Sequence, residues 1–83
     1  MVKDIVIIGA GGLAKEVAFL IEDINKEKMQ WNILGFIDND EKNVGVKLNV
    51  IPIIGTDDWL ISQVKSINIV FGIDHPSLIK FFQ

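Results

Sequence analysis

Residues 5–14 read Ile-Val-Ile-Ile-Gly-Ala-Gly-Gly-Leu-Ala, so that four β-branched residues lead directly into a glycine-rich turn. An apolar run without polar alternation is typical of a strand covered on both faces, as in the parallel sheets of α/β domains. The glycines let the backbone turn sharply and leave room for a ligand to approach the peptide N–H groups. We therefore predict a central strand, a turn that can hold a phosphate, and the start of a helix.

A helical pattern follows the glycines over residues 12–25. Small residues Ala10, Ala14 and Ala18 are expected on the side that meets the sheet. Charged residues occupy the opposite face, which predicts an amphipathic helix. The larger apolar residues of this pattern are Leu13, Val17, Leu20, Ile21 and Ile24. Residues 33–38 then predict a second buried strand that ends in an acid, completing a βαβ unit.

Shorter elements are predicted in the rest of the chain. Pro52 belongs near the start of a strand or on an edge, because it cannot donate to a ladder. Thr56 suits the N-cap of a second helix, and Pro76 suits the first position of a last helix that begins near Asp74. The remaining predictions are an acidic loop over 39–43, a short edge strand or extended loop over 44–49, a third strand over 51–55 and a fourth over 67–73.

These elements predict a small Rossmann-like, three-layer α/β domain with a parallel sheet of about four strands, spanning residues 1–83. The predicted last helix carries apolar residues that we expect another part of a protein to cover, namely Leu78, Ile79, Phe81 and Phe82. We therefore expect residues 1–83 to be one domain of a longer protein.

Composition excludes several classes of function. The 83 residues are 49% hydrophobic with only two prolines, which is the composition of a globular chain and not of a disordered one. The absence of cysteine excludes disulfides and thiolate metal sites, and it is compatible with a cytoplasmic setting. The net charge of −3, without a cluster of Lys or Arg, argues against binding to nucleic acid or to an anionic membrane.

The glycine turn fits a dinucleotide-binding fingerprint. Gly9, Gly11 and Ala14 have the spacing of its alanine-ending form, and Asp38 ends the next predicted strand. The predicted turn, the Asp38-Asn39 pair and the end of the fourth strand at Gly72-Ile73-Asp74 would all lie at the carboxyl edge of one parallel sheet, where open α/β sheets bind ligands. The pattern favours nucleotide binding. The alternative is that the glycines serve only the turn and that Asp38 only keeps a loop in contact with solvent.

Other candidate residues favour structural roles. His75 is the sole histidine, and a helix-cap role is a better interpretation than a catalytic one. The chain has no second His or Cys and no ligand spacing among its carboxylates, so we predict no metal site. Trp31 and Trp59 are expected to pack in the core and not to stack on a base. We therefore predict no catalytic residue.

Four segments in order, 7–12, 15–18, 35–39 and 52–55, resemble the N-terminal domain of bacterial sugar O-acyltransferases. These enzymes are of the sialic-acid O-acetyltransferase and bacillosamine N-acetyltransferase type, and the resemblance covers nearly the whole chain. It implies a Rossmann-like domain that binds the nucleotide-sugar acceptor, typically a UDP-linked amino sugar. It also implies a following left-handed β-helix, absent from these residues, that binds acetyl-CoA, carries the catalytic histidine and forms homotrimers.

The resemblance also implies roles for particular residues. The glycine loop, with Gly9, Ala10, Gly11 and Gly12, would approach the sugar-phosphate portion of the ligand. Asp38 and Asn39 would contact the uracil, and Gly72 would line the far wall. The sequence departs from the family pattern at three places, which are Leu13-Ala14 for His-Gly, Asp38-Asn39 for two acids, and Val50 for glycine.

Two of these departures change the chemistry of the expected site. Leu13 would make the pocket more apolar beside the sugar. Asn39 offers a hydrogen-bond donor where an acid only accepts. The leading hypothesis is an acceptor-binding domain of a sugar acetyltransferase that binds no cofactor itself and is not catalytic alone. The alternatives are an NAD(P)-binding redox or sensor module and a non-catalytic interaction domain.

Overall fold

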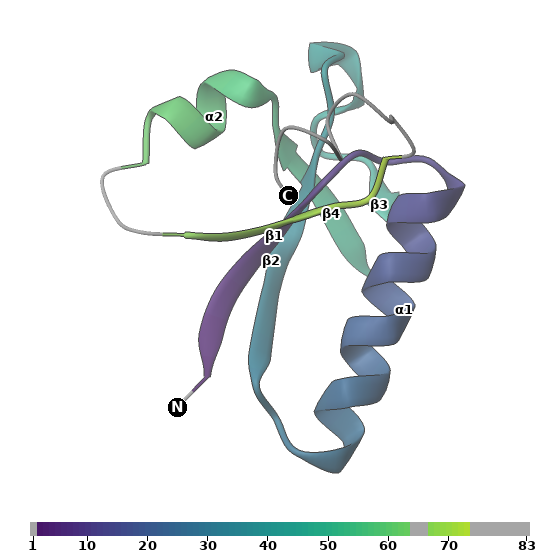
Figure 1. Cartoon of the computed structure of the whole chain (residues 1–83). Helices are drawn as coiled ribbons and strands as arrows, with labels where there is room; N and C mark the ends of the chain where they lie inside the picture. The colour runs from purple at the N-terminus through teal and green to yellow at the C-terminus, as the bar shows by residue number, and fades with distance from the viewer. Residues whose placement is uncertain (1, 64–66, 74–83) are drawn as a thin grey trace.

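The computed structural model describes residues 2–63 and 67–73 (Figure 1). The predicted last helix, with Asp74, His75 and the apolar residues after them, therefore lies outside the described residues. The elements in chain order are β1 (Lys3–Ile8), α1 (Gly12–Glu27), β2 (Trp31–Ile37), the 3₁₀ turn η1 (Glu41–Asn43), β3 (Lys47–Leu48), β4 (Ile51–Gly55), α2 (Asp57–Ile61) and β5 (Asn68–Phe71).

The five strands form one sheet in the order β3-β4-β2-β1-β5. β1 is parallel to both β2 and β5, and β2 is parallel to β4, whereas β3 is antiparallel to β4. The α/β class is confirmed, but the predicted parallel sheet of about four strands is wrong, because the sheet has five strands and is mixed. The difference arises where Asn49, at φ 60°, turns the chain so that Leu48 pairs with Ile51.

The first strand is central and covered on both faces, as its sequence predicts. Val6 and Ile7 are each 0% exposed although neighbouring side chains on a strand point to opposite faces. Ile7 packs in the core cluster with Ala14 and Ala18 of α1. In Figure 1, α1 lies along one side of the strands and α2 lies on the other. α1, which follows β1, and α2, which precedes β5 in the chain, therefore lie on different sides of the sheet.

The predicted first helix is confirmed and ends two residues later than expected. Its buried residues are Ala14, Ala18 and Ile21, so the small residues meet the sheet as predicted. The larger apolar side chains do not all share this face, because Leu20 is 59% exposed and Ile24 is 44% exposed. Alanines let the helix axis approach the sheet closely. Ile21 is buried in this contact, whereas Leu20 and Ile24 lie along the flank of the helix, outside it.

This arrangement predicts that substitutions at two adjacent residues of α1 change the free energy of unfolding by different amounts. Leu20→Gln is expected to change the free energy of unfolding by less than about 0.5 kcal/mol, because the side chain is largely in water. Ile21→Val is expected to cost about 1 kcal/mol, because it removes a buried methyl group. Denaturant unfolding of both variants checks this. A larger loss from Leu20→Gln than from Ile21→Val would contradict the observed helix face.

The two tryptophans have packing roles, as predicted. Trp31 is partly buried against the core cluster. Trp59 lies in α2 directly against Gly55 at the end of β4. The predicted N-cap of α2 is confirmed in position at Thr56, although the Thr56 side chain makes no capping hydrogen bond. Pro52 is the second residue of β4, near the start of the strand as predicted.

Candidate functional site

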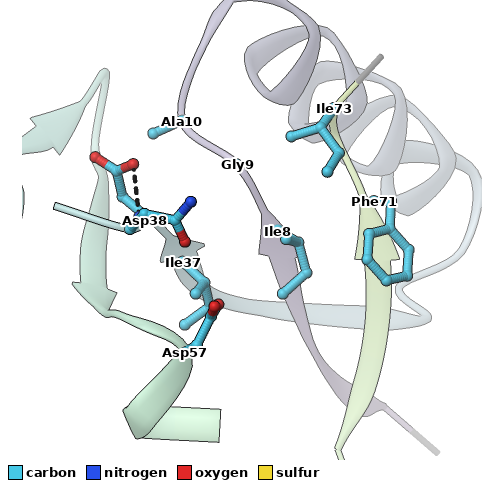
Figure 2. Close-up of a pocket in the computed structure, with 9 residues that line it drawn as sticks. Ile8, Gly9, Ala10, Ile37, Asp38, Asp57, Phe71 and Ile73 are labelled. Carbon is cyan, nitrogen blue, oxygen red and sulfur yellow. Dashed lines mark hydrogen bonds between the residues drawn. The ribbon is translucent and has the colours of Figure 1, made fainter. Parts of the chain in front are cut away.

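A cavity of about 390 Å³ opens at the carboxyl edge of the sheet (Figure 2). It lies where β1 has β2 on one side and β5 on the other. Because α1, which follows β1, and α2, which precedes β5 in the chain, lie on different sides of the sheet, this is a switch point of the topology. Open α/β sheets bind ligands at such a point. The lining residues are Ile8, Gly9, Ala10, Ile37, Asp38, Asn39, Asp57, Phe71 and Ile73.

The turn after β1 requires glycine at its first position. Gly9 has φ 111°, a conformation that side-chain-bearing residues rarely adopt, and its N–H donates to the Ile37 carbonyl over 2.7 Å. A Cβ at Gly9 would lie 2.7 Å from Cγ2 of Ile73 and 2.9 Å from the Gly72 carbonyl oxygen. The turn is thus packed between β2 and the two residues that follow β5, and these contacts fix its position at the cavity.

The start of α1 is open to a ligand. Among the described residues, apart from the adjoining residues and the backbone of α1 itself, no atom lies within 4 Å of the place that a Cβ would take at Gly11 or at Gly12. Gly11 is the N-cap and supplies no side-chain hydrogen bond, and the first turn carries no acid. The first N–H groups of a helix have no partner within the helix, so these are available to an anionic group.

The acidic side of the cavity is ordered by hydrogen bonds. The Asp38 N–H donates to the Gly55 carbonyl over 3.0 Å, which ties the end of β2 to β4. The Asp38 carboxylate accepts from the Asn39 N–H at 2.8 Å and from Nδ2 of Asn43 at 2.7 Å. Asp57, in the first turn of α2, is the second carboxylate that lines the cavity. No described Lys lines this cavity, so its formal charges are negative.

Four of the residues expected at the site come together in this cavity. Gly9 and Ala10 form its middle, and Asp38 and Asn39 form one end. Figure 2 shows Asp38 on one side of the turn at Gly9 and Ala10, with Phe71 and Ile73 on the other side. The expected residues at the start of α1 do not line this cavity but are exposed to solvent, and they are Gly11, Gly12 and Leu13.

Gly72 does not line the cavity. It is buried, and a Cβ there would lie 2.6 Å from Cα of Ala14, so Gly72 faces α1. Its neighbours Phe71 and Ile73 line the cavity in its place, because alternate residues of an extended chain point to opposite faces. Asp74, expected at the same edge, lies outside the described residues.

Ile73 was expected at this edge together with Gly72, and it lines the cavity. Four other lining residues were not expected from the sequence, namely Ile8, Ile37, Asp57 and Phe71. A usable signal was present for two of them, since Ile8 and Ile37 are the last residues of their strands and directly precede the expected site residues. Asp57 directly follows the predicted N-cap Thr56, and a place in the first turn of a helix gives no direction relative to a cavity.

Comparison with known families bears on this site. Residues 4–78 match the family model described as the PglD N-terminal domain. The chain belongs to this family. The resemblance found in the sequence is thereby confirmed, and the match covers both the glycine turn and the acidic end of β2 in this PglD N-terminal domain. PglD-like proteins are bacterial sugar acetyltransferases. Searches among curated proteins and among solved structures each gave no match.

Within residues 2–63 and 67–73, no three His, Cys, Asp or Glu side chains are grouped so that they could hold a metal ion. In the same part of the chain, no helix has the length and apolar character needed to span a bilayer.

Proposed function

We propose that this PglD N-terminal domain binds the acceptor of a sugar acetyltransferase, a nucleotide-sugar of the UDP-linked amino-sugar class. One observation carries the proposal, which is that a single cavity joins the Gly9-Ala10 turn to Asp38 and Asn39 at the switch point of the sheet. Membership of the family supports it. Acetyl-CoA would bind elsewhere, on a separate β-helical domain of a homotrimeric protein.

Two parts of the site suit different parts of such a ligand. The glycine turn in the middle of the cavity, and the uncapped start of α1 that follows it outside the lining, offer backbone N–H groups, which suit a diphosphate. Asp38 presents carboxylate oxygens that accept hydrogen bonds, and Asn39 has an amide that both donates and accepts. These groups suit the polar edge of a base or the hydroxyls of a ribose.

The role of the domain in the reaction is positioning. The described part of the cavity holds two carboxylates, the Asn39 amide and apolar side chains, and the Asp38 carboxylate and the Asn39 amide are assigned to binding. Holding the acceptor amine or hydroxyl near the acyl donor lowers the entropic barrier of a two-substrate reaction without a catalytic group. The domain alone is therefore expected to bind its ligand and not to catalyse acetyl transfer.

Titration calorimetry of the 83-residue chain with UDP, UDP-linked sugars and NAD tests this function. Heat of binding with UDP and a UDP-sugar, and none with NAD, is the expected result. Binding of NAD without any response to UDP or the UDP-sugars would identify a redox or sensor module. No response to any of these ligands would favour the remaining alternative, a non-catalytic interaction domain.

The charge of the cavity predicts how salt affects binding of UDP. Backbone amides are expected to hold the diphosphate, and the two carboxylates repel it, so no strong charge attraction exists for salt to screen. Raising NaCl from about 50 to about 500 mM is expected to change Kd by less than about threefold. Calorimetry across this range checks it. A tenfold or greater weakening would show that cationic side chains hold the phosphates.

A further inference from the structure

The loop after β2 folds back onto the acid that ends the strand. Nδ2 of Asn43 donates to Oδ2 of Asp38 at 2.7 Å, while the Asn39 N–H donates to Oδ1 at 2.8 Å. Each carboxylate oxygen is therefore held by one donor. Asn43 itself is not among the residues that line the cavity, so its effect on a ligand would be transmitted through Asp38.

Backbone hydrogen bonds fix Asn43 in place. The Asn43 N–H donates to the Asp40 carbonyl over 3.0 Å, and the Asp40 side chain accepts from the Lys42 N–H at 3.0 Å, which closes η1. Beyond η1, the Gly45 N–H donates to the Ile53 carbonyl of β4 over 2.8 Å. The loop is thus anchored to the sheet on both sides of Asn43, and its amide is held in position before any ligand arrives.

The bonding of Asp38 leaves a defined capacity for a ligand. An ionised carboxylate has about four acceptor positions, two on each oxygen, and it cannot donate. The two protein donors use one position on each oxygen. One position on each oxygen remains, and its direction depends on the rotation of the carboxylate, which Asn43 and Asn39 fix from two sides.

We propose that Asn43 is a positioning residue for ligand binding, which orients the Asp38 carboxylate so that it accepts from an N–H or O–H group of the bound nucleotide. The inference rests on the proposed function. Pre-oriented groups bind more tightly, because a ligand then does not have to order them. Without Asn43, only the Asn39 N–H still holds the carboxylate, so the carboxylate rotates more freely and water replaces the lost donor.

Two substitutions test this role, with UDP as the probe. Asn43→Ala is expected to raise the Kd of the 83-residue chain for UDP about tenfold, the effect of one charge-assisted hydrogen bond made in a poorer geometry. Asn43→Asp is expected to raise it further, because two carboxylates would then face each other. Asn32→Ala is the matched control, since Nδ2 of Asn32 donates to Oδ1 of Asp4 at 3.0 Å, at the opposite edge of the sheet. Its Kd is expected to equal that of the unaltered chain.

A double-mutant cycle separates positioning from a general effect on the loop. In an Asp38→Asn background, Asn43→Ala is expected to change the Kd by less than about twofold, because the group that it orients has been replaced. A purely structural role for Asn43 would give the same tenfold loss in both backgrounds and would overturn the inference. Thermal unfolding of each variant is measured alongside, and Asn43→Ala is expected to behave like Asn32→Ala.

The outcomes distinguish this inference from the function on which it rests. If the unaltered chain binds neither UDP nor a UDP-sugar, the proposed function fails and the role of Asn43 fails with it. If the unaltered chain binds UDP and Asn43→Ala binds it equally well, only the positioning role is overturned.

Discussion

Gly72→Ala is expected to lower the free energy of unfolding by about 3 kcal/mol, at the upper end of the cost of overpacking a core. The added Cβ would lie 2.6 Å from Cα and 2.9 Å from Cβ of Ala14, and 3.1 Å from Cγ2 of Ile7. The nearest of these atoms belongs to the helix backbone, so α1 itself must move away from the sheet. A domain of this size has a total stability of about 4–12 kcal/mol, so the loss is a large fraction of it.

Gly12→Ala is the matched control for this substitution. In the part of the chain that the structure describes, no atom beyond the adjoining residues and the α1 backbone lies within 4 Å of its added Cβ, and the residue is the first of α1. Alanine there is expected to leave stability unchanged or to raise it by up to about 1 kcal/mol, because it restricts the unfolded chain. Denaturant or thermal unfolding of both variants checks the pair. Equal stabilities for the two variants would contradict the observed contact between β5 and α1.

Asp38→Asn is expected to weaken binding of UDP by about 10- to 100-fold, the range for loss of a hydrogen bond to a charged group. The substitution preserves shape and removes one negative charge. Removing a negative charge near an anionic ligand would by itself strengthen binding, so a weakening has to come from a lost direct contact. Calorimetry with UDP measures the change, and competition against a tighter UDP-sugar extends the range.

Asp40→Asn is the matched control for the charge. Asp40 caps η1 and does not line the cavity, and asparagine caps as well as aspartate does. The Kd of this variant for UDP is expected to stay within about twofold of that of the unaltered chain, because the change in net charge is the same but no ligand contact is lost. Equal or tighter binding by Asp38→Asn would instead mean that the acid does not contact the ligand.

The differences between expectation and structure have identifiable causes. The short segment before Ile51 alternates weakly, and only its pairing with β4 makes it a strand, which turned an expected parallel sheet into a mixed one. The helical period correctly indicated an amphipathic α1, yet it did not distinguish the core face from the flank on which Leu20 lies. Both features depend on contacts with residues distant in sequence, and local patterns carry no information about those contacts.

Part of the site could be predicted from the sequence, and the rest depended on contacts with distant residues. Gly9 and Asp38 each follow a strongly patterned strand, and parallel strands bring their carboxyl ends to one edge whatever their order. Gly72 was placed at the same edge correctly, but whether it faces the cavity depends on the phase of the strand. If the alternation along this segment were shifted by one residue, Gly72 would face the cavity in place of Phe71 and Ile73. The packing of β5 against α1 sets that phase.

The sequence by itself determined the α/β class, the central first strand, the glycine turn and the family, because each of these depends on short-range periodicity or on backbone freedom at particular residues. The tertiary structure alone decided which side chains line the cavity and how Asn43 meets Asp38. The physical reason is that a cavity is bounded by strands that are neighbours in space, and that the direction of each side chain is fixed only when the sheet and its helices have packed.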